Sequence, residues 1–140
     1  MAYNTRMLAI FPTLLAFRLF SPFLLRIFLG VILFNFGYSK IKKEKMEKAE
    51  FFERINLKPG IYYVWFFGIL EILLGLFLIA GYMTQLSALL SVILLSVVIY
   101  LRLKNVPGLT NTASFYTALL FIALSLLFTG PGFFAVDLPL

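Results

Sequence analysis

Long apolar runs alternate with short polar connections along the chain. Four segments are apolar over roughly 20 residues, enough to cross the hydrocarbon core of a bilayer, at about 22–39, 61–80, 85–103 and 112–130. The connection GYMTQ is so short that the second and third segments must be antiparallel neighbours. LKNVPGLTNT, with its Pro-Gly loop signal, joins the third to the fourth. The pattern therefore predicts an all-α fold, a transmembrane up-down four-helix bundle.

The N-terminal segment is apolar but interrupted. Pro12 and Arg18 break the run, and a single helix from Met7 to Tyr38 would be about 48 Å long, more than a bilayer core. We therefore expect an N-terminal interfacial helix over about 7–20 that bends into the first span.

The segment from residue 40 to residue 58 is the most charged part of the chain. Its apolar side chains recur at every third position: Met46, Ala49, Phe52 and Ile55. This spacing predicts an amphipathic linker helix over about 42–55 that lies at the membrane interface. A solvated helix without contacts is the alternative.

Composition supports a membrane protein. Hydrophobic residues make up 62% of the 140 residues and charged residues 13%, so little polar surface is left to face water. We expect one membrane domain over residues 1–140. Cysteine and histidine are both absent, which excludes disulfides, Cys/His zinc sites, Cys-ligated iron–sulfur clusters and bis-His haem. No metal site and no covalently held cofactor is therefore expected.

The net charge of +6 is concentrated beside the membrane. Seven of the twelve basic residues lie in the basic linker, residues 40–58, which favours a membrane-surface role over nucleic-acid binding. The first and third connections hold nine Lys and Arg residues together, whereas the second connection and the C-terminal tail hold none. The positive-inside rule then predicts a multi-pass protein of the cytoplasmic (inner) membrane, with both termini outside and the basic linker in the cytoplasm.

One acid, Glu71, lies in the middle of the second span, in GILEILLG. The surrounding apolar side chains favour insertion by more than the acid costs, so insertion does not explain its presence. An ionisable residue within the membrane is a candidate functional site. Arg26 is the expected partner, because the depths of the two residues, counted from the linker, differ by only about 4–5 Å.

Glycine spacing agrees with this pairing. Gly30 and Gly37 lie on one helical stripe with Arg26, and Gly68 and Gly75 lie on another with Glu71. Small residues on both faces predict close packing of the two helices.

Three interpretations of the two charges stay open. They form an ion pair that fixes the bundle register, or the polar floor of a site for a ligand head group or a proton, or Glu71 stays protonated while Arg26 reaches the interface. Candidate polar extensions of the site are Asn35, Tyr38, Lys40 and Tyr100. Tyr at this depth is also typical of an interfacial aromatic belt. A pocket lined by aromatic residues would suit a quinone ring or an isoprenoid tail.

Three stretches, taken in order, carry a family resemblance. RIFLGVILFNFGYSKI resembles the Arg-x-x-x-Gly…Gly-x-x-Lys signature of the DoxX family of small four-span membrane proteins. GILEILLGLFLIAGYMTQLSALL is similar to the second helix and tight turn of that family, and LLFTGPGFFAVD to its Gly-Pro-Gly…Asp ending. The resemblance covers about residues 22–137. It departs at Thr84-Gln85, where the family often has Thr-Arg, and in the long lysine-rich first connection, so the orientation of relatives is not carried over.

The resemblance implies a membrane subunit, since some relatives belong to oxidoreductase complexes that pass electrons to quinone. Arg26, Lys40 and Glu71 would be the shared polar residues, and the Gly130-Pro131-Gly132 turn with Asp137 would close the bundle. The leading hypothesis is a DoxX-like subunit that anchors a redox partner or binds a quinone or lipid at an Arg26–Glu71 centre, and that is not an enzyme alone. A structural subunit of a respiratory or photosynthetic complex and a small-solute or proton carrier are the alternatives. The expected partners are the lipid bilayer and either other subunits or further copies of the chain.

Overall fold

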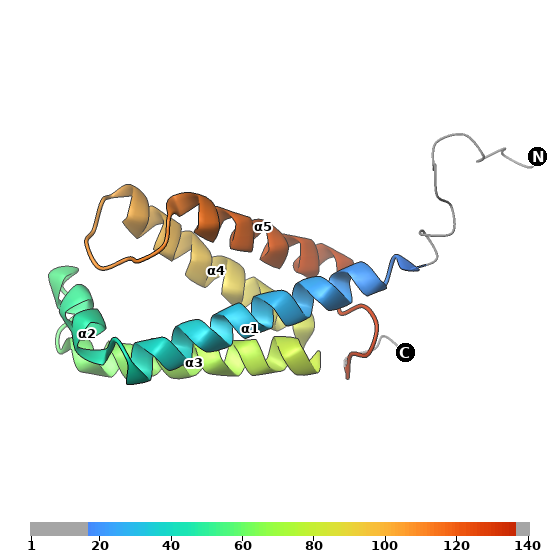
Figure 1. The fold of residues 1–140 in the computed structure, drawn as a ribbon, viewed down its shortest axis with the longest axis horizontal. Coiled ribbons are helices and arrows are strands. Elements are labelled where there is room, and N and C mark those ends of the chain that lie inside the picture. Colours follow the sequence, from blue (N-terminus) through green and yellow to red (C-terminus); the bar gives the residue numbers. More distant parts are fainter. Residues whose placement is uncertain (1–16, 137–140) are drawn as a thin grey trace, which may run out of the picture.

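The computed structural model describes residues 17–136, which form helices joined by short connections and contain no strand (Figure 1). The helices within this range are α1 (Phe20–Lys42), α2 (Lys45–Arg54), α3 (Gly60–Ala80), α4 (Thr84–Leu103) and α5 (Ala113–Thr129). The all-α prediction is confirmed. The N-terminal interfacial helix expected over 7–20 lies almost wholly outside the described residues.

The predicted spans correspond to four of these helices. α1, α3 and α4 are each long and apolar enough to cross a membrane. α5 is apolar but has 17 residues, the lower end of the length that spans a hydrocarbon core. The chain is therefore a multi-pass membrane protein.

Glycine allows α1 and α3 to pack with their backbones almost in contact. A Cβ atom added to Gly30 would lie 2.8 Å from the carbonyl oxygen of Gly75, and one added to Gly75 would lie 2.6 Å from that of Gly30. Gly37 and Gly68 oppose each other two helical turns closer to α2, and a Cβ atom added to Gly37 would overlap the carbonyl oxygen of Gly68. These two contacts fix the register of the antiparallel α1–α3 pair.

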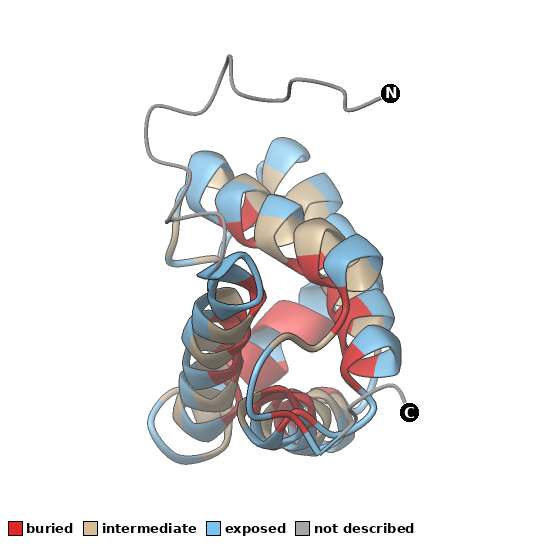
Figure 2. Cartoon of the chain, turned by 90° about the vertical axis from the view of Figure 1, so that its right-hand side faces the viewer, coloured by how far each residue is buried: buried red, intermediate tan, exposed pale blue. Residues whose placement is uncertain are grey.

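The helices pack as two pairs. α1 packs mainly on α3, and α4 on α5, whereas α3 and α4 share few contacts although a tight turn joins them. That turn forms because α3 ends at Gly81 in the left-handed conformation, with a φ of 70°. The two pairs diverge towards the end that carries α2 (Figure 1). The buried residues lie on the sides of the helices that face one another (Figure 2). Those of the apolar core are Leu29, Leu33, Leu74, Leu78, Ala88, Leu95, Tyr116, Leu119, Ala123 and Leu126.

The linker helix α2 covers the start of α3. Ala49, Phe51 and Phe52 are buried against Val64, which has no exposed surface. α2 is therefore not a helix without contacts. Met46, which the spacing placed on the apolar face, is 73% exposed, because the buried face includes residue 51 instead.

Gly75→Ala tests the close packing of α1 on α3. The added Cβ meets two backbone atoms, the carbonyl oxygen of Gly30 and the nitrogen of Phe34, which cannot rotate away. We expect a loss of about 1–3 kcal/mol of stability, measured by unfolding in SDS-titrated micelles. Ala118→Leu, on the exposed face of α5, should leave the midpoint unchanged. Equal midpoints for both variants would contradict the close packing of α1 on α3.

Candidate functional site

Arg26 does not bind Glu71. Its guanidinium has no exposed surface and donates hydrogen bonds to three carbonyl oxygens of the C-terminal segment. The distances are 2.7 Å to Pro131, 3.4 Å to Phe133 and 3.2 Å to Phe134. The Arg26–Glu71 ion pair predicted from depth is therefore wrong.

The register of α1 and α3 explains the error. A Cβ atom added to Gly81 would lie 2.5 Å from Nη1 of Arg26, so the guanidinium is beside the end of α3. Glu71 lies ten residues earlier on α3, about 15 Å along the helix axis. Side chains also lean towards the N-terminus of their own helix, so in an antiparallel pair these two lean apart. The C-terminal end of α3 provides a favourable negative dipole for the cation.

Arg26 instead holds the C-terminal turn on the bundle. The same turn is anchored by a hydrogen bond from the backbone nitrogen of Phe133 to the carbonyl oxygen of Leu19, 3.2 Å long. At Gly132 an added Cβ would lie 2.7 Å from that same carbonyl oxygen. Asp137, which the family resemblance assigned to this turn, lies outside the described residues.

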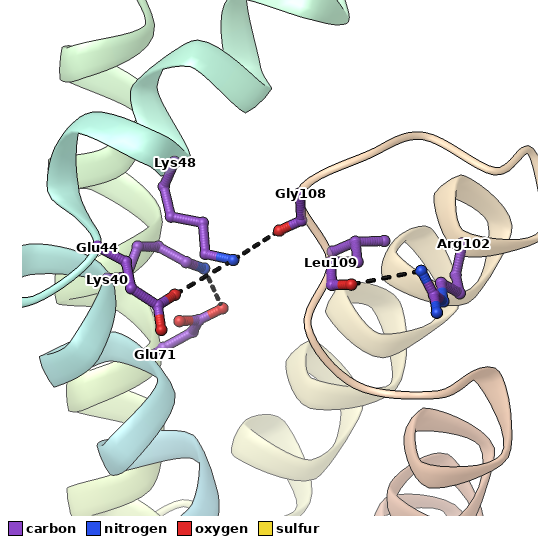
Figure 3. Close-up of polar contacts among 7 residues, drawn as sticks. All are labelled: Lys40, Glu44, Lys48, Glu71, Arg102, Gly108 and Leu109. Atoms are coloured by element: carbon purple, nitrogen blue, oxygen red, sulfur yellow. Dashed lines mark hydrogen bonds and ion pairs between the residues drawn. The ribbon is translucent and has the colours of Figure 1, made fainter.

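Glu71 forms its ion pair with Lys40. The Nζ of Lys40 lies 2.6 Å from Oε1 of Glu71, and both side chains are largely buried (Figure 3). The backbone of Lys40 lies nearer to α2 than that of Glu71. The Lys40 side chain leans towards the N-terminus of α1, and the Glu71 side chain leans towards the N-terminus of α3. The two side chains therefore converge, and Lys40, expected only as an extension of the site, is the partner of the acid.

Two further charges from the α2 region join this pair. The Nζ of Lys48 lies 3.3 Å from Oε2 of Glu44 and donates a 2.7 Å hydrogen bond to the carbonyl oxygen of Gly108 (Figure 3). Gly108 belongs to the α4–α5 loop, so Lys48 connects the two helix pairs at the end where they diverge. Arg102 fastens the same loop through the carbonyl oxygen of Leu109, at 3.3 Å.

A cavity of about 350 Å³ lies beneath this connection, between the two helix pairs. Its four charged lining residues, Lys40, Glu44, Lys48 and Glu71, lie together (Figure 3). The other polar lining residues are Asn35, Ser39, Thr110 and Asn111. The rest is apolar and aromatic, with rings from Phe36, Phe51, Phe52, Phe67 and Tyr116. A pocket with this division suits an amphiphile, with its head group at the charges and its tail among the rings.

Glu71 has unused hydrogen-bonding capacity in this wall. The residue is 7% exposed, and its Oε2 atom is buried without a hydrogen-bond partner among the described residues. Because a buried carboxylate oxygen without a donor is unfavourable, this atom marks a place where a ligand or a water molecule can donate a hydrogen bond.

The other candidate residues divide between the cavity and the surface. Asn35 lines the cavity. Tyr38 and Tyr100 are 40% and 60% exposed and do not line it. Lys42 lies over the Tyr38 ring at 5.4 Å and Lys104 over the Tyr100 ring at 5.7 Å, so both tyrosines belong to the surface. Glu44 and Lys48 were not among the predicted site residues. Their i,i+4 spacing is the signal in the sequence that could have indicated them.

No cluster of His, Cys, Asp and Glu that could hold a metal ion occurs within residues 17–136. The site is therefore built from hydrogen-bonding and apolar groups, and it can position a ligand and donate or accept protons.

Arg26→Met should detach the C-terminal turn. Its removal leaves three carbonyl oxygens without their donor, and we expect a loss of about 3–5 kcal/mol of stability with faster hydrogen exchange at residues 130–136. Arg54→Met is the matched control, since Arg54 is half exposed and its ion pair with Glu50 is 3.7 Å long. Unchanged exchange in the first variant would contradict the assigned role of Arg26.

A double-mutant cycle on Lys40 and Glu71 should give a coupling free energy of about 1–3 kcal/mol. Lys40→Met leaves a buried carboxylate alone and should destabilise strongly, while adding Glu71→Leu should recover much of the loss. Unfolding in SDS measures all four proteins. The same cycle on the exposed pair Glu50–Arg54 should give less than about 0.5 kcal/mol. Equal coupling in the two cycles would mean that burial does not strengthen the Lys40–Glu71 pair.

Comparison with known proteins identifies the family of the chain. The sequence model of the DoxX family matches residues 21–103, more than half of the chain. Neither the curated proteins nor the solved structures give a match. The matched range contains Arg26, Lys40 and Glu71 and stops before the C-terminal turn. The chain therefore belongs to the DoxX family.

Proposed function

We propose that this chain is an integral membrane subunit that binds a quinone, or a lipid of similar build, in the cavity at the α2 end. The Lys40–Glu71 pair forms the polar end of the site, in place of the Arg26–Glu71 centre expected from the sequence. The head group lies at this pair and the isoprenoid tail runs among the aromatic rings.

The observation that carries this proposal is the composition of the cavity wall. Its volume of about 350 Å³ falls in the range of small-molecule sites. The wall is mostly apolar, and its charged groups gather on one side, contributed by α1, α2 and α3. A structural ion pair alone would be packed against its neighbours, whereas this pair borders open space.

We propose a redox partner because the chain has neither Cys nor His. Without Cys or His it cannot hold a metal centre in the usual way, so electrons for a bound quinone come from the cofactor of another subunit. The α2 end carries a net positive charge on which an acidic partner can dock, because its exposed basic residues outnumber its exposed acids, Glu47, Glu50 and Glu53. The exposed basic residues are Lys42, Lys43, Arg54, Lys58 and Lys104. This end faces the cytoplasm in the proposed orientation, with both termini outside.

The structural-subunit alternative has its own support. Arg26, the most deeply buried cation within residues 17–136, donates its hydrogen bonds to the C-terminal turn of its own chain. This role is compatible with ligand binding at the other end, so we retain the cavity as the functional site.

Photolabelling tests the proposal. The full chain in lipid nanodiscs is labelled with an azido-quinone, and peptide mass spectrometry should find the label on residues 94–101 and 109–116, with displacement by decylubiquinone. Val98→Trp fills the cavity and should remove most of the labelling. Ile93→Trp, on the exposed face of the same helix, should leave it unchanged.

Equal labelling of both tryptophan variants, with label spread over exposed helix faces, would show that the quinone only dissolves in the surrounding lipid. Comparable unfolding midpoints for the two variants show that both are folded.

A further inference from the structure

We infer that the site selects a head group that carries a hydroxyl donor, and therefore binds a quinol in preference to the corresponding quinone. The inference rests on the proposed function, because it specifies the chemistry of the ligand in the same cavity. An isoprenoid alcohol has the same hydroxyl and is the second source of this chemistry.

The carboxyl group of Glu71 is only partly satisfied. Its Oε1 is engaged by Lys40 at 2.6 Å, and its Oε2 is buried without a partner among the described residues. Glu71 lines the cavity, and only 7% of its surface is exposed. An ionised carboxylate oxygen only accepts hydrogen bonds, so the group that satisfies it must be a donor.

Lys40 and Glu71 place a hydrogen-bond donor and an acceptor side by side. Lys40 has three N–H donors and gives one to Glu71. A hydroxyl oxygen can accept from Lys40 while its hydrogen is donated to Glu71. A quinone carbonyl can only accept, so it satisfies Lys40 and leaves the Glu71 oxygen facing another oxygen.

The neighbouring charges, Glu44 and Lys48, are paired with each other. Lys48 is directed to Glu44 and to the Gly108 carbonyl oxygen, and it makes no hydrogen bond to Glu71 among the described residues. Two lysines and two glutamates balance each other around the cavity. A neutral donor keeps this balance, whereas a phosphate head group would bring a negative charge beside Glu71. A quinol or an alcohol fits better than a phospholipid.

The inference has a redox consequence. A ligand bound about tenfold more tightly as quinol than as quinone has its two-electron midpoint potential raised by about 30 mV. Bound quinone would then accept electrons from the partner more readily than free quinone in the bilayer.

The test is competition against the azido-quinone under anaerobic conditions, with the wild-type full chain in nanodiscs. The competitors are decylubiquinol, decylubiquinone, the dimethyl ether of decylubiquinol and geranylgeraniol. We expect half-displacement by the quinol at a concentration about tenfold below that of the quinone. The dimethyl ether keeps the ring and loses both donors, so it should be no better than the quinone.

Glu71→Gln should reduce the preference to less than about threefold, because a side-chain amide can donate to a carbonyl as well as accept from a hydroxyl. The ligand series on the wild type stands on its own if this variant does not fold.

The outcomes separate the two proposals. Equal displacement by quinol, quinone and ether of a label that Val98→Trp removes overturns the hydroxyl inference and leaves quinone binding in place. No displacement by any competitor overturns the proposed function itself. Displacement by geranylgeraniol as strong as by the quinol supports the hydroxyl inference with an isoprenoid alcohol as the ligand, and weak displacement supports it with the quinol ring.

Discussion

The contact between the glycine faces of α1 and α3 determines where Arg26, Lys40 and Glu71 lie relative to one another. Because the carbonyl oxygens of Gly30 and Gly75 leave no room for a Cβ on the opposite helix, the pair has one register. That register places Lys40 within reach of Glu71 and places Arg26 at the far end of α3. Sliding one helix by a turn would separate the ion pair and remove Arg26 from the C-terminal turn. The polar site and the closure of the bundle both depend on this backbone packing.

Sequence reasoning reached the helices, the close-packed glycines and the buried acid, because each is encoded locally. Apolar length marks a span, glycine spacing marks a face, and a single carboxylate in an apolar run is visible by itself. The partner of Glu71 was missed because depth was counted from the helix ends and the lean of the side chains was left out. The opposed pairs Gly30–Gly75 and Gly37–Gly68 place residue 34, not residue 29, opposite Glu71, and with this register the lean favours Lys40 over Arg26. The lysine lay in the family signature all along, but its position at the end of the span made it look interfacial.

The cavity could not be predicted in the same way. It exists because α4 and α5 form their own pair and diverge from α1 and α3 at the end that carries α2. No local pattern encodes that divergence, which depends on contacts between residues distant in sequence. The bond from Lys48 to the Gly108 carbonyl illustrates the difficulty, since it joins residues 60 positions apart. Glu44 and Lys48 read as an ordinary helix-surface pair until the α4–α5 loop is placed above them.

The two ends of the bundle therefore solve different physical problems. At the Arg26 end, the two terminal nitrogens of one buried cation donate to three carbonyl oxygens of a turn of the same chain, while its Nε has no partner among the described residues. At the α2 end, a buried ion pair borders a cavity and leaves one carboxylate oxygen without a donor. Buried ion pairs add little net stability compared with apolar packing, so stability alone does not account for a pair placed there. A pair that must stay polar, buried and incompletely satisfied is better explained by a ligand that completes it.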